Sequence, residues 1–232
     1  MRKPTDQEMS RRHLLRMGFT ATAASFLAGG LDLALLSHAH AQSTHTPDAA
    51  LAVLMAGNKR FIAGHLTACD QDLTVLKQHT EEKQEPFAAV LSCADSRVPV
   101  ELVFDQSIGQ LFVTRVAGNV ITPEIIGSLE YGAAVLGTKV ILIMGHSNCG
   151  AVKATIQSKE VPGQISALFP HIQPAVDQAG HDLEAVTKAN AKIQAALLRQ
   201  SSTVISGMVK SGTVKVLAAY YDLGTGSVAV LE

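Results

Sequence analysis

The stretch KVILIMGHSNCG, residues 139–150, decides the fold of this chain of 232 residues. Its first half, Lys139 to Met144, is an apolar run without a helical period. Short continuous runs of this kind suit strands that are buried on both faces, as in a parallel sheet. A polar turn follows, and a helical pattern then begins at Cys149. The stretch therefore predicts a strand, a turn and a helix, which is the repeating unit of an α/β fold.

The same alternation recurs along the chain. Further strands are expected at residues 87–92, 111–116 and 214–220. Helices are expected at residues 48–63, 73–82, 122–136, 149–158, 165–179 and 182–210, and the last of these contains a break. The turn at residues 224–227 predicts a hairpin into a last strand at residues 228–231, which pairs antiparallel at the sheet edge. We expect an α/β fold with a mostly parallel four-stranded sheet, an antiparallel edge strand and flanking helices.

Composition and charge narrow the functions to consider. Hydrophobic residues make up 47% of the chain and charged residues 17%, which is typical of a folded domain and excludes a disordered one. The formal net charge of -1 gives no reason to expect a nucleic acid or an anionic surface as partner. We expect one domain that acts on a small molecule.

The N-terminus resembles a twin-arginine export signal. It combines SRRHLLR at residues 10–16, an uncharged stretch at residues 17–31 and a small-x-small site at residues 39–41. The alternative is a membrane anchor, because residues 17–36 are long enough to span a bilayer. Asp32 and three glycines argue against that alternative.

Cleavage after Ala41 is therefore expected. Residues 1–41 would be the export signal, and residues 42–232 a single exported domain without a stable membrane anchor, periplasmic if the organism has that compartment. Residues 42–82 would form its N-terminal helical arm.

Two polar stretches follow strands in this scheme, SCADSR at residues 92–97 and GHSNCG at residues 145–150. Ligand-binding residues of open α/β sheets gather at the carboxyl ends of the strands. If the two strands are neighbours, Cys93, His146 and Cys149 converge on one point. Two thiolates and an imidazole favour zinc.

The fourth zinc position separates a structural site from a catalytic one. The remaining cysteine, Cys69, lies in an unrelated polar stretch. An open fourth position that holds water is therefore expected, as in catalytic zinc sites. A disulfide between Cys93 and Cys149 is the alternative in an oxidising compartment.

Asp95 and Arg97 follow Cys93 in the same turn. A guanidinium beside Asp95 lowers the pKa of the carboxyl group and fixes its orientation. Asp95 can then accept a hydrogen bond from zinc-bound hydroxide, or it can bind zinc itself and close the site. The alternative is an ion pair with a structural role only.

The segments CADSRVP at residues 93–99 and GHSNCG at residues 145–150 resemble the two hallmark motifs of the β-class carbonic anhydrases. The resemblance implies that one Zn²⁺ per subunit is bound by Cys93, His146 and Cys149, with Asp95 and Arg97 as a dyad beside the fourth ligand. It also implies the family's α/β fold and hydration of carbon dioxide to bicarbonate by zinc-bound hydroxide.

The resemblance extends to the substrate pocket and to assembly. Gln84 falls where plant-like, open-site members place a glutamine that hydrogen-bonds substrate. Phe112 and Tyr131 fall where those members line the carbon dioxide pocket, although Ala117 replaces a bulkier residue. Members are homodimers or dimers of dimers with the active site at the subunit interface, which makes residues 47–63 a dimerisation arm.

Two other functions remain open at this point. A hydrolase of carbonyl sulfide or carbon disulfide uses the same zinc, cysteine and histidine set. A non-catalytic zinc-binding or redox-sensing protein would not need Asp95 and Arg97, and both are present.

Overall fold

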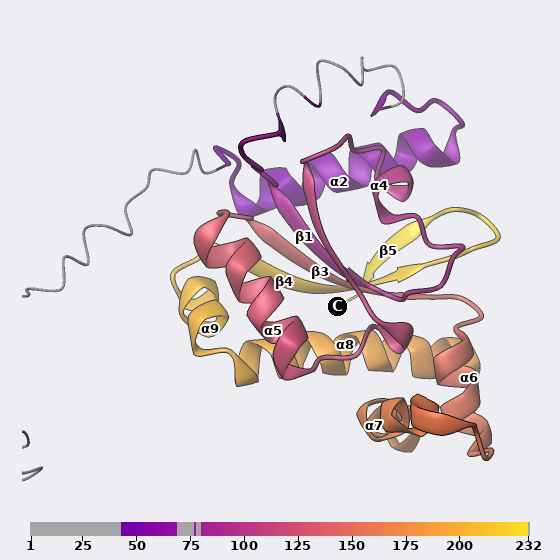
Figure 1. Ribbon diagram of the computed structural model, residues 1–232. Coiled ribbons are helices and arrows are strands. Elements are labelled where there is room, and N and C mark those ends of the chain that lie inside the picture. Colours follow the sequence, from indigo (N-terminus) through magenta and orange to yellow (C-terminus); the bar gives the residue numbers. More distant parts are fainter. Residues whose placement is uncertain (1–42, 69–76, 78–79, 232) are drawn as a thin grey trace, which may run out of the picture. The chain divides into compact units, whose positions relative to one another are not determined.

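A five-stranded sheet forms the centre of the computed structural model, which describes residues 43–68, 77 and 80–231 (Figure 1). The strand order is β2-β1-β3-β4-β5. The strands are β1 (Ala88–Ser92), β2 (Leu111–Arg115), β3 (Val140–His146), β4 (Lys215–Tyr221) and β5 (Val228–Leu231). The first four are parallel, and β5 pairs antiparallel with β4 at the edge. The predicted fold class is confirmed.

The central strands are the most apolar and the most buried. Every residue of β1 and β3 is buried, because helices cover both faces of the sheet, as the continuous apolar runs predict. β1 and β3 are direct neighbours, with Ser92 paired to Met144. The two polar stretches that follow these strands therefore leave the sheet side by side, as expected.

Helices form a layer on each face of the sheet and a group beyond its carboxyl end. One face is covered by α2 (Pro47–Ile62) and α4 (Val100–Val103), and the other by α5 (Pro123–Glu130), α8 (Leu183–Ser201) and α9 (Thr203–Lys210) (Figure 1). A third apolar cluster joins α6 (Gly150–Gln157), α7 (Phe169–Ala179) and α8 near the ends of β1 and β3. This third cluster includes Cys93 and Cys149, two of the residues expected to bind metal.

Local signals explain several helix boundaries. The Thr46 side chain accepts a hydrogen bond from the amide of Ala49, and Pro47 opens α2. The break predicted within residues 182–210 occurs at Ser202, whose hydroxyl accepts a hydrogen bond from the amide of Ile205 and starts α9. Side-chain caps thus mark the start of α2 and the start of α9.

Some elements differ from the sequence prediction. The helix expected at residues 122–136 is α5 followed by a π-helical turn, η4 (Tyr131–Val135), in which the amide of Leu136 bonds the carbonyl of Tyr131. The short helices α4, η3 (Ala117–Asn119) and η5 (Gly163–Leu168) were not expected as separate elements. Gly132 lies against the Phe112 ring, where a Cβ atom would come within 3.0 Å. Glycine at this position of the π-helical turn leaves room for the ring.

Several predictions concern residues outside the described part of the chain. The export signal at residues 1–41 and Cys69 lie wholly outside it, and the helix expected at residues 73–82 lies largely outside it. Among the described residues, no helix combines the length and apolar character needed to cross a bilayer.

Candidate metal centre

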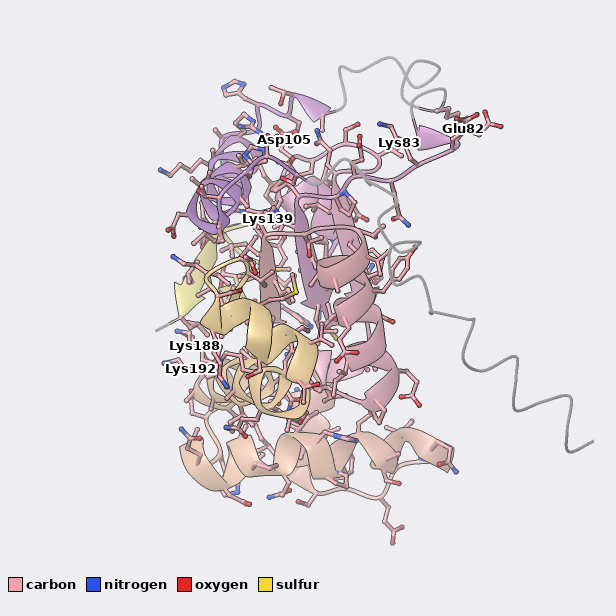
Figure 2. The ribbon with its side chains drawn as sticks, turned by 90° about the vertical axis from the view of Figure 1, so that its left-hand side faces the viewer. Glu82, Lys83, Asp105, Lys139, Lys188 and Lys192 are labelled. Carbon is pink, nitrogen blue, oxygen red and sulfur yellow. The ribbon has the colours of Figure 1, made fainter. Side chains whose placement is uncertain are left out.

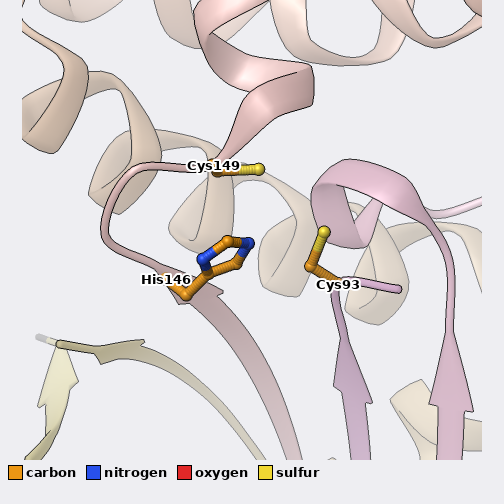
Figure 3. Close-up of side chains that lie close together, drawn as sticks. All are labelled: Cys93, His146 and Cys149. Atoms are coloured by element: carbon orange, nitrogen blue, oxygen red, sulfur yellow. The ribbon is translucent and has the colours of Figure 1, made fainter. Parts of the chain in front are cut away.

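Cys93, His146 and Cys149 meet at the carboxyl end of the sheet, and Figure 3 shows their side chains pointing toward one another. One ligand atom from each lies within 4.8 Å of the others, and all three residues are buried. Cys93 follows β1, His146 is the last residue of β3, and Cys149 precedes α6. The predicted convergence of the three side chains is confirmed.

The turn between β3 and α6 sets the spacing of His146 and Cys149. Asn148 adopts a left-handed conformation, with φ of 55°, which asparagine tolerates better than most residues. Cys149 is then the N-cap residue of α6. The chain thus reverses direction within three residues, and both side chains face the same point.

His146 is oriented as a metal ligand. Its Nδ1 lies 2.9 Å from the carbonyl oxygen of Ser147. A carbonyl can only accept, so Nδ1 carries the hydrogen and Nε2 keeps its lone pair. Nε2 is buried and has no hydrogen-bond partner in the described structure. A buried acceptor without a partner is costly, and a metal ion at this point would satisfy it.

Both cysteines of the group are free and buried, so no disulfide joins them. The neighbouring Cys149 thiol, with His146 and the amide of Gly118, lowers the pKa of Cys93 below its usual value. The same contact with Cys93, together with burial, raises the pKa of Cys149. A cation would stabilise both thiolates, since metal ions deprotonate coordinating thiols. Two thiols and an imidazole fit zinc.

Asp95 lies beside this group and is held by Arg97. The guanidinium donates from Nε to Oδ1 at 2.9 Å and from Nη2 to Oδ2 at 2.8 Å. The Arg97 amide also donates to Oδ1 at 3.0 Å. The side-chain bonds from Arg97 hold the pKa of Asp95 well below its usual value. Asp95 Oδ2 lies 3.8 Å from His146 Nε2, so the ionised carboxylate borders the position where a metal would sit.

Comparison with known proteins identifies the family. A family model described as carbonic anhydrase matches residues 88–228, which include both motifs. A carbonic anhydrase of Mycolicibacterium smegmatis is 35% identical over 190 residues, covering 78% of this chain and 92% of the relative. Carbonic anhydrase 2 of Mycobacterium tuberculosis is 32% identical, covering 78% and 90%. The chain belongs to the β-carbonic anhydrase family.

Solved structures agree with this assignment. The β-carbonic anhydrase CafA of Aspergillus fumigatus matches with a TM-score of 0.63 and 26% identity, over 78% of this chain and 90% of that one. Two tetrameric β-carbonic anhydrases of Sordaria macrospora match with a TM-score of 0.60 and 21% identity, over 68% and 90%, which shows the fold alone. This β-carbonic anhydrase chain therefore shares its sheet and helix arrangement with solved members.

The predicted substrate residues lie apart from the metal ligands within one subunit. Phe112 and Tyr131 contact each other, with ring centroids 6.2 Å apart. Tyr131 and Gln84 line one cavity of about 450 Å³. Glu82 and Lys83, which are labelled in Figure 2, line the same cavity. Gln84 precedes β1, whereas Cys93 follows it. The two groups of residues therefore lie toward opposite ends of the sheet.

Sequence patterns did not single out Arg115, which supports the loop that carries Cys93 and Asp95. Arg115 donates from Nε to the Cys93 carbonyl at 3.0 Å and from Nη2 to the Asp95 carbonyl at 2.5 Å. Both acceptors are backbone carbonyls, which every residue has. The residue types at positions 93 and 95 therefore do not reveal these bonds. Only the pairing of Arg115 with Ser92 across β1 and β2 brings the guanidinium to this loop.

Proposed function

We propose that this chain is a zinc enzyme that catalyses the reversible hydration of carbon dioxide to bicarbonate and a proton. The observation that carries the proposal is the buried Cys93, His146 and Cys149 group, whose unpartnered His146 Nε2 lies beside the ionised Asp95. Zinc held by these three residues would lower the pKa of a bound water toward 7, which supplies hydroxide at neutral pH.

Asp95 would orient the attacking oxygen. As a carboxylate it can only accept hydrogen bonds, and three donors of Arg97 hold it in place. Its Oδ2 accepts one of these bonds and has lone-pair capacity left toward the metal position. That oxygen would accept a hydrogen bond from the attacking hydroxide, so that a lone pair of the hydroxide oxygen faces carbon dioxide. Arg97 would keep Asp95 from binding the metal itself, as in the open-site subtype.

Metal analysis together with stopped-flow carbon dioxide hydration tests the proposal. The zinc-loaded mature chain, residues 42–232, should contain one zinc per subunit and hydrate carbon dioxide. Cys149→Ser should lose both the metal and the activity, because a serine hydroxyl replaces a thiolate ligand. Cys69→Ser is the control and should keep both. Zinc occupancy equal to wild type in Cys149→Ser would remove Cys149 from the ligand set.

Two subunits would complete each active site. Ile108, Tyr131 and Val135 expose large apolar side chains, and the first two border the cavity that contains Gln84. Dimerisation through this surface would bury these side chains and bring Gln84, Phe112 and Tyr131 of one subunit to the metal ligands of another. The arm at residues 42–82, which includes α2, would wrap the partner. Two such dimers would give a tetramer, the state of the two β-carbonic anhydrases of Sordaria macrospora.

The mature enzyme would act outside the cytoplasm. The twin arginines, the uncharged stretch and the small-x-small site within residues 1–41 support export by the twin-arginine route. Fusing residues 1–41 to a reporter protein tests this: the reporter should be exported, and replacing both Arg11 and Arg12 by lysine should keep it inside. Equal export of the lysine variant would contradict the proposal.

A further inference from the structure

Two buried amide side chains of α8 lie under the turn that follows β2. Asn190 is 0% exposed and Gln194 is 1% exposed. They are one helical turn apart and therefore share a face of the helix. Lys188 and Lys192, labelled in Figure 2, mark the outer side of the same helix. Uncharged amides in a core require partners, because an unpaired buried polar group is costly.

Their partners form a continuous path to the metal group. Gln194 Oε1 accepts from the amide of Ile121 at 2.8 Å, and Gln194 Nε2 donates to Asn190 Oδ1 at 3.1 Å. Asn190 Nδ2 donates to the carbonyl of Gly118 at 2.9 Å. The amide of Gly118 donates to Cys93 Sγ at 3.3 Å. Asn190 is therefore separated from a proposed metal ligand by one glycine residue.

The turn that carries Gly118 is held on its other side as well. Gly118 has φ of 75°, and a Cβ atom there would come within 2.8 Å of Ile172 Cδ1 in α7. Gln194 Nε2 also donates to the carbonyl of His171 in α7 at 2.9 Å. The turn thus lies between β1, α7 and α8. Among the described residues, Asn190 and Gln194 are the side chains of α8 that hydrogen-bond it.

We propose that Asn190, supported by Gln194, is a positioning residue for the metal site, which holds Gly118 so that its amide hydrogen points at Cys93 Sγ. This inference rests on the proposed function, because Cys93 matters here as a metal ligand. Groups that hydrogen-bond metal ligands orient them and tune the metal, and their loss commonly lowers metal affinity by about 10- to 100-fold. A hydrogen bond to the sulfur also withdraws electron density from it.

Asn190→Leu tests the proposal in the mature chain. Leucine has the same branched arrangement of four side-chain heavy atoms as asparagine, but it cannot form the bond to Gly118 and leaves that carbonyl free to turn. We expect zinc affinity, measured by competition with a chromogenic chelator, to fall about tenfold. In the cobalt(II)-substituted protein, the sulfur-to-cobalt charge-transfer band should move to longer wavelength, because a thiolate without its hydrogen bond gives up an electron more easily.

Ser202→Ala is the matched control. Ser202 is also buried, and it caps α9 at the far end of α8, about 18 Å along the helix axis from Asn190. Its loss should lower stability and leave both the zinc affinity and the cobalt band as in wild type. A purely structural role for Asn190 would give the same pattern as this control.

An Asn190→Leu protein with wild-type zinc affinity and an unshifted cobalt band would overturn the inference. If this variant does not fold, Gln194→Met removes the support of Asn190 and should shift the band in the same direction, and an unshifted band there would overturn the inference equally. Failure of the wild-type chain to bind zinc or cobalt would instead overturn the proposed function, so the two failures are distinguishable.

Discussion

At the scale of single residues, Arg97 controls what the Asp95 carboxylate can bind. The guanidinium occupies both oxygens of Asp95, and it is itself half-exposed, with 54% of its side chain accessible. Asp95 Oδ2 lies close enough to the metal position to become a ligand if it is released. An open fourth metal position would therefore depend on the geometry of a two-pronged ion pair, which favours arginine over lysine.

Arg97→Ala should suppress carbon dioxide hydration near pH 7. Without the ion pair, Asp95 can bind the metal and take the fourth position, and we expect kcat/KM to fall at least about tenfold, the scale seen when groups around a metal are removed. Stopped-flow assays with matched zinc content measure this. Arg97→Lys is the graded control and should be intermediate. Activity equal to wild type in Arg97→Ala would show that Asp95 and Arg97 are only a structural pair.

The sequence predicted these residues because their types are chemically distinctive. Thiols, an imidazole and an aspartate beside an arginine are few in the chain, and their placement after strands limits where they can lie. The tautomer of His146 could not be predicted in the same way. It depends on the carbonyl of Ser147, and every residue has a carbonyl.

At the scale of elements, a buried carboxylate joins α2 and the chain after it to the core. Asp105, labelled in Figure 2, accepts from Arg60 Nε at 2.5 Å and from the amides of Thr67 and Ala68 at 2.9 and 2.8 Å. Burial alone would raise the pKa of Asp105, but these donors outweigh it and lower the pKa below the usual value. Asp105 thus ties the proposed dimerisation arm to the loop after α4.

Asp105→Asn should lower the free energy of unfolding by about 3 kcal/mol, because it breaks a buried ion pair. This value is the low end of the usual cost, since Arg60 is partly exposed. Urea unfolding of the zinc-loaded chain at pH 7 measures this. Asp48→Asn is the control: it breaks the exposed pair with Lys215 at the start of α2 and should cost less than about 1 kcal/mol. Equal stability of the two variants would show that Asp105 does not anchor the arm.

The lowered pKa of Asp105 also predicts how stability depends on pH. A carboxyl group whose pKa is lower in the folded state stabilises the protein above its unfolded pKa of about 3.9, and this contribution is lost as the pH falls through the folded pKa. The free energy of unfolding of wild type should therefore fall below about pH 4 more steeply than that of Asp105→Asn. Parallel pH profiles for the two proteins would contradict this.

At the scale of the whole molecule, exposed apolar side chains around the Gln84 cavity point to a subunit interface. Ile108→Lys places a charge on this surface, where Ile108 is 49% exposed. We expect dissociation to smaller species in sedimentation velocity and a loss of hydration activity, with the zinc content unchanged. Ile165→Lys, at a residue that is 45% exposed in η5, is the control and should assemble normally. Unchanged assembly of Ile108→Lys would place the interface elsewhere.

Export and metal binding would be linked if the protein crosses the membrane already folded. Zinc bound in the reducing cytoplasm would then protect Cys93 and Cys149, which lie close enough together to oxidise. Replacing residues 1–41 by a general secretory signal should yield a zinc-poor product with a disulfide, detected by metal analysis and thiol titration. Equal zinc occupancy by both routes would contradict this link.

The sequence by itself determined the α/β class, the strands and the zinc-binding residue types, because apolar runs, turns and reactive side chains are local signals. Strand boundaries were predicted within about two residues, the usual margin for such assignments. Only the tertiary structure decided that β1 and β3 are neighbours, that Arg115 and Asn190 reach the loops beside Cys93, and that His146 keeps Nε2 free. The first two features bring together backbone atoms that lie far apart in the chain, and the third depends on the direction of the neighbouring Ser147 carbonyl. Residue type records neither.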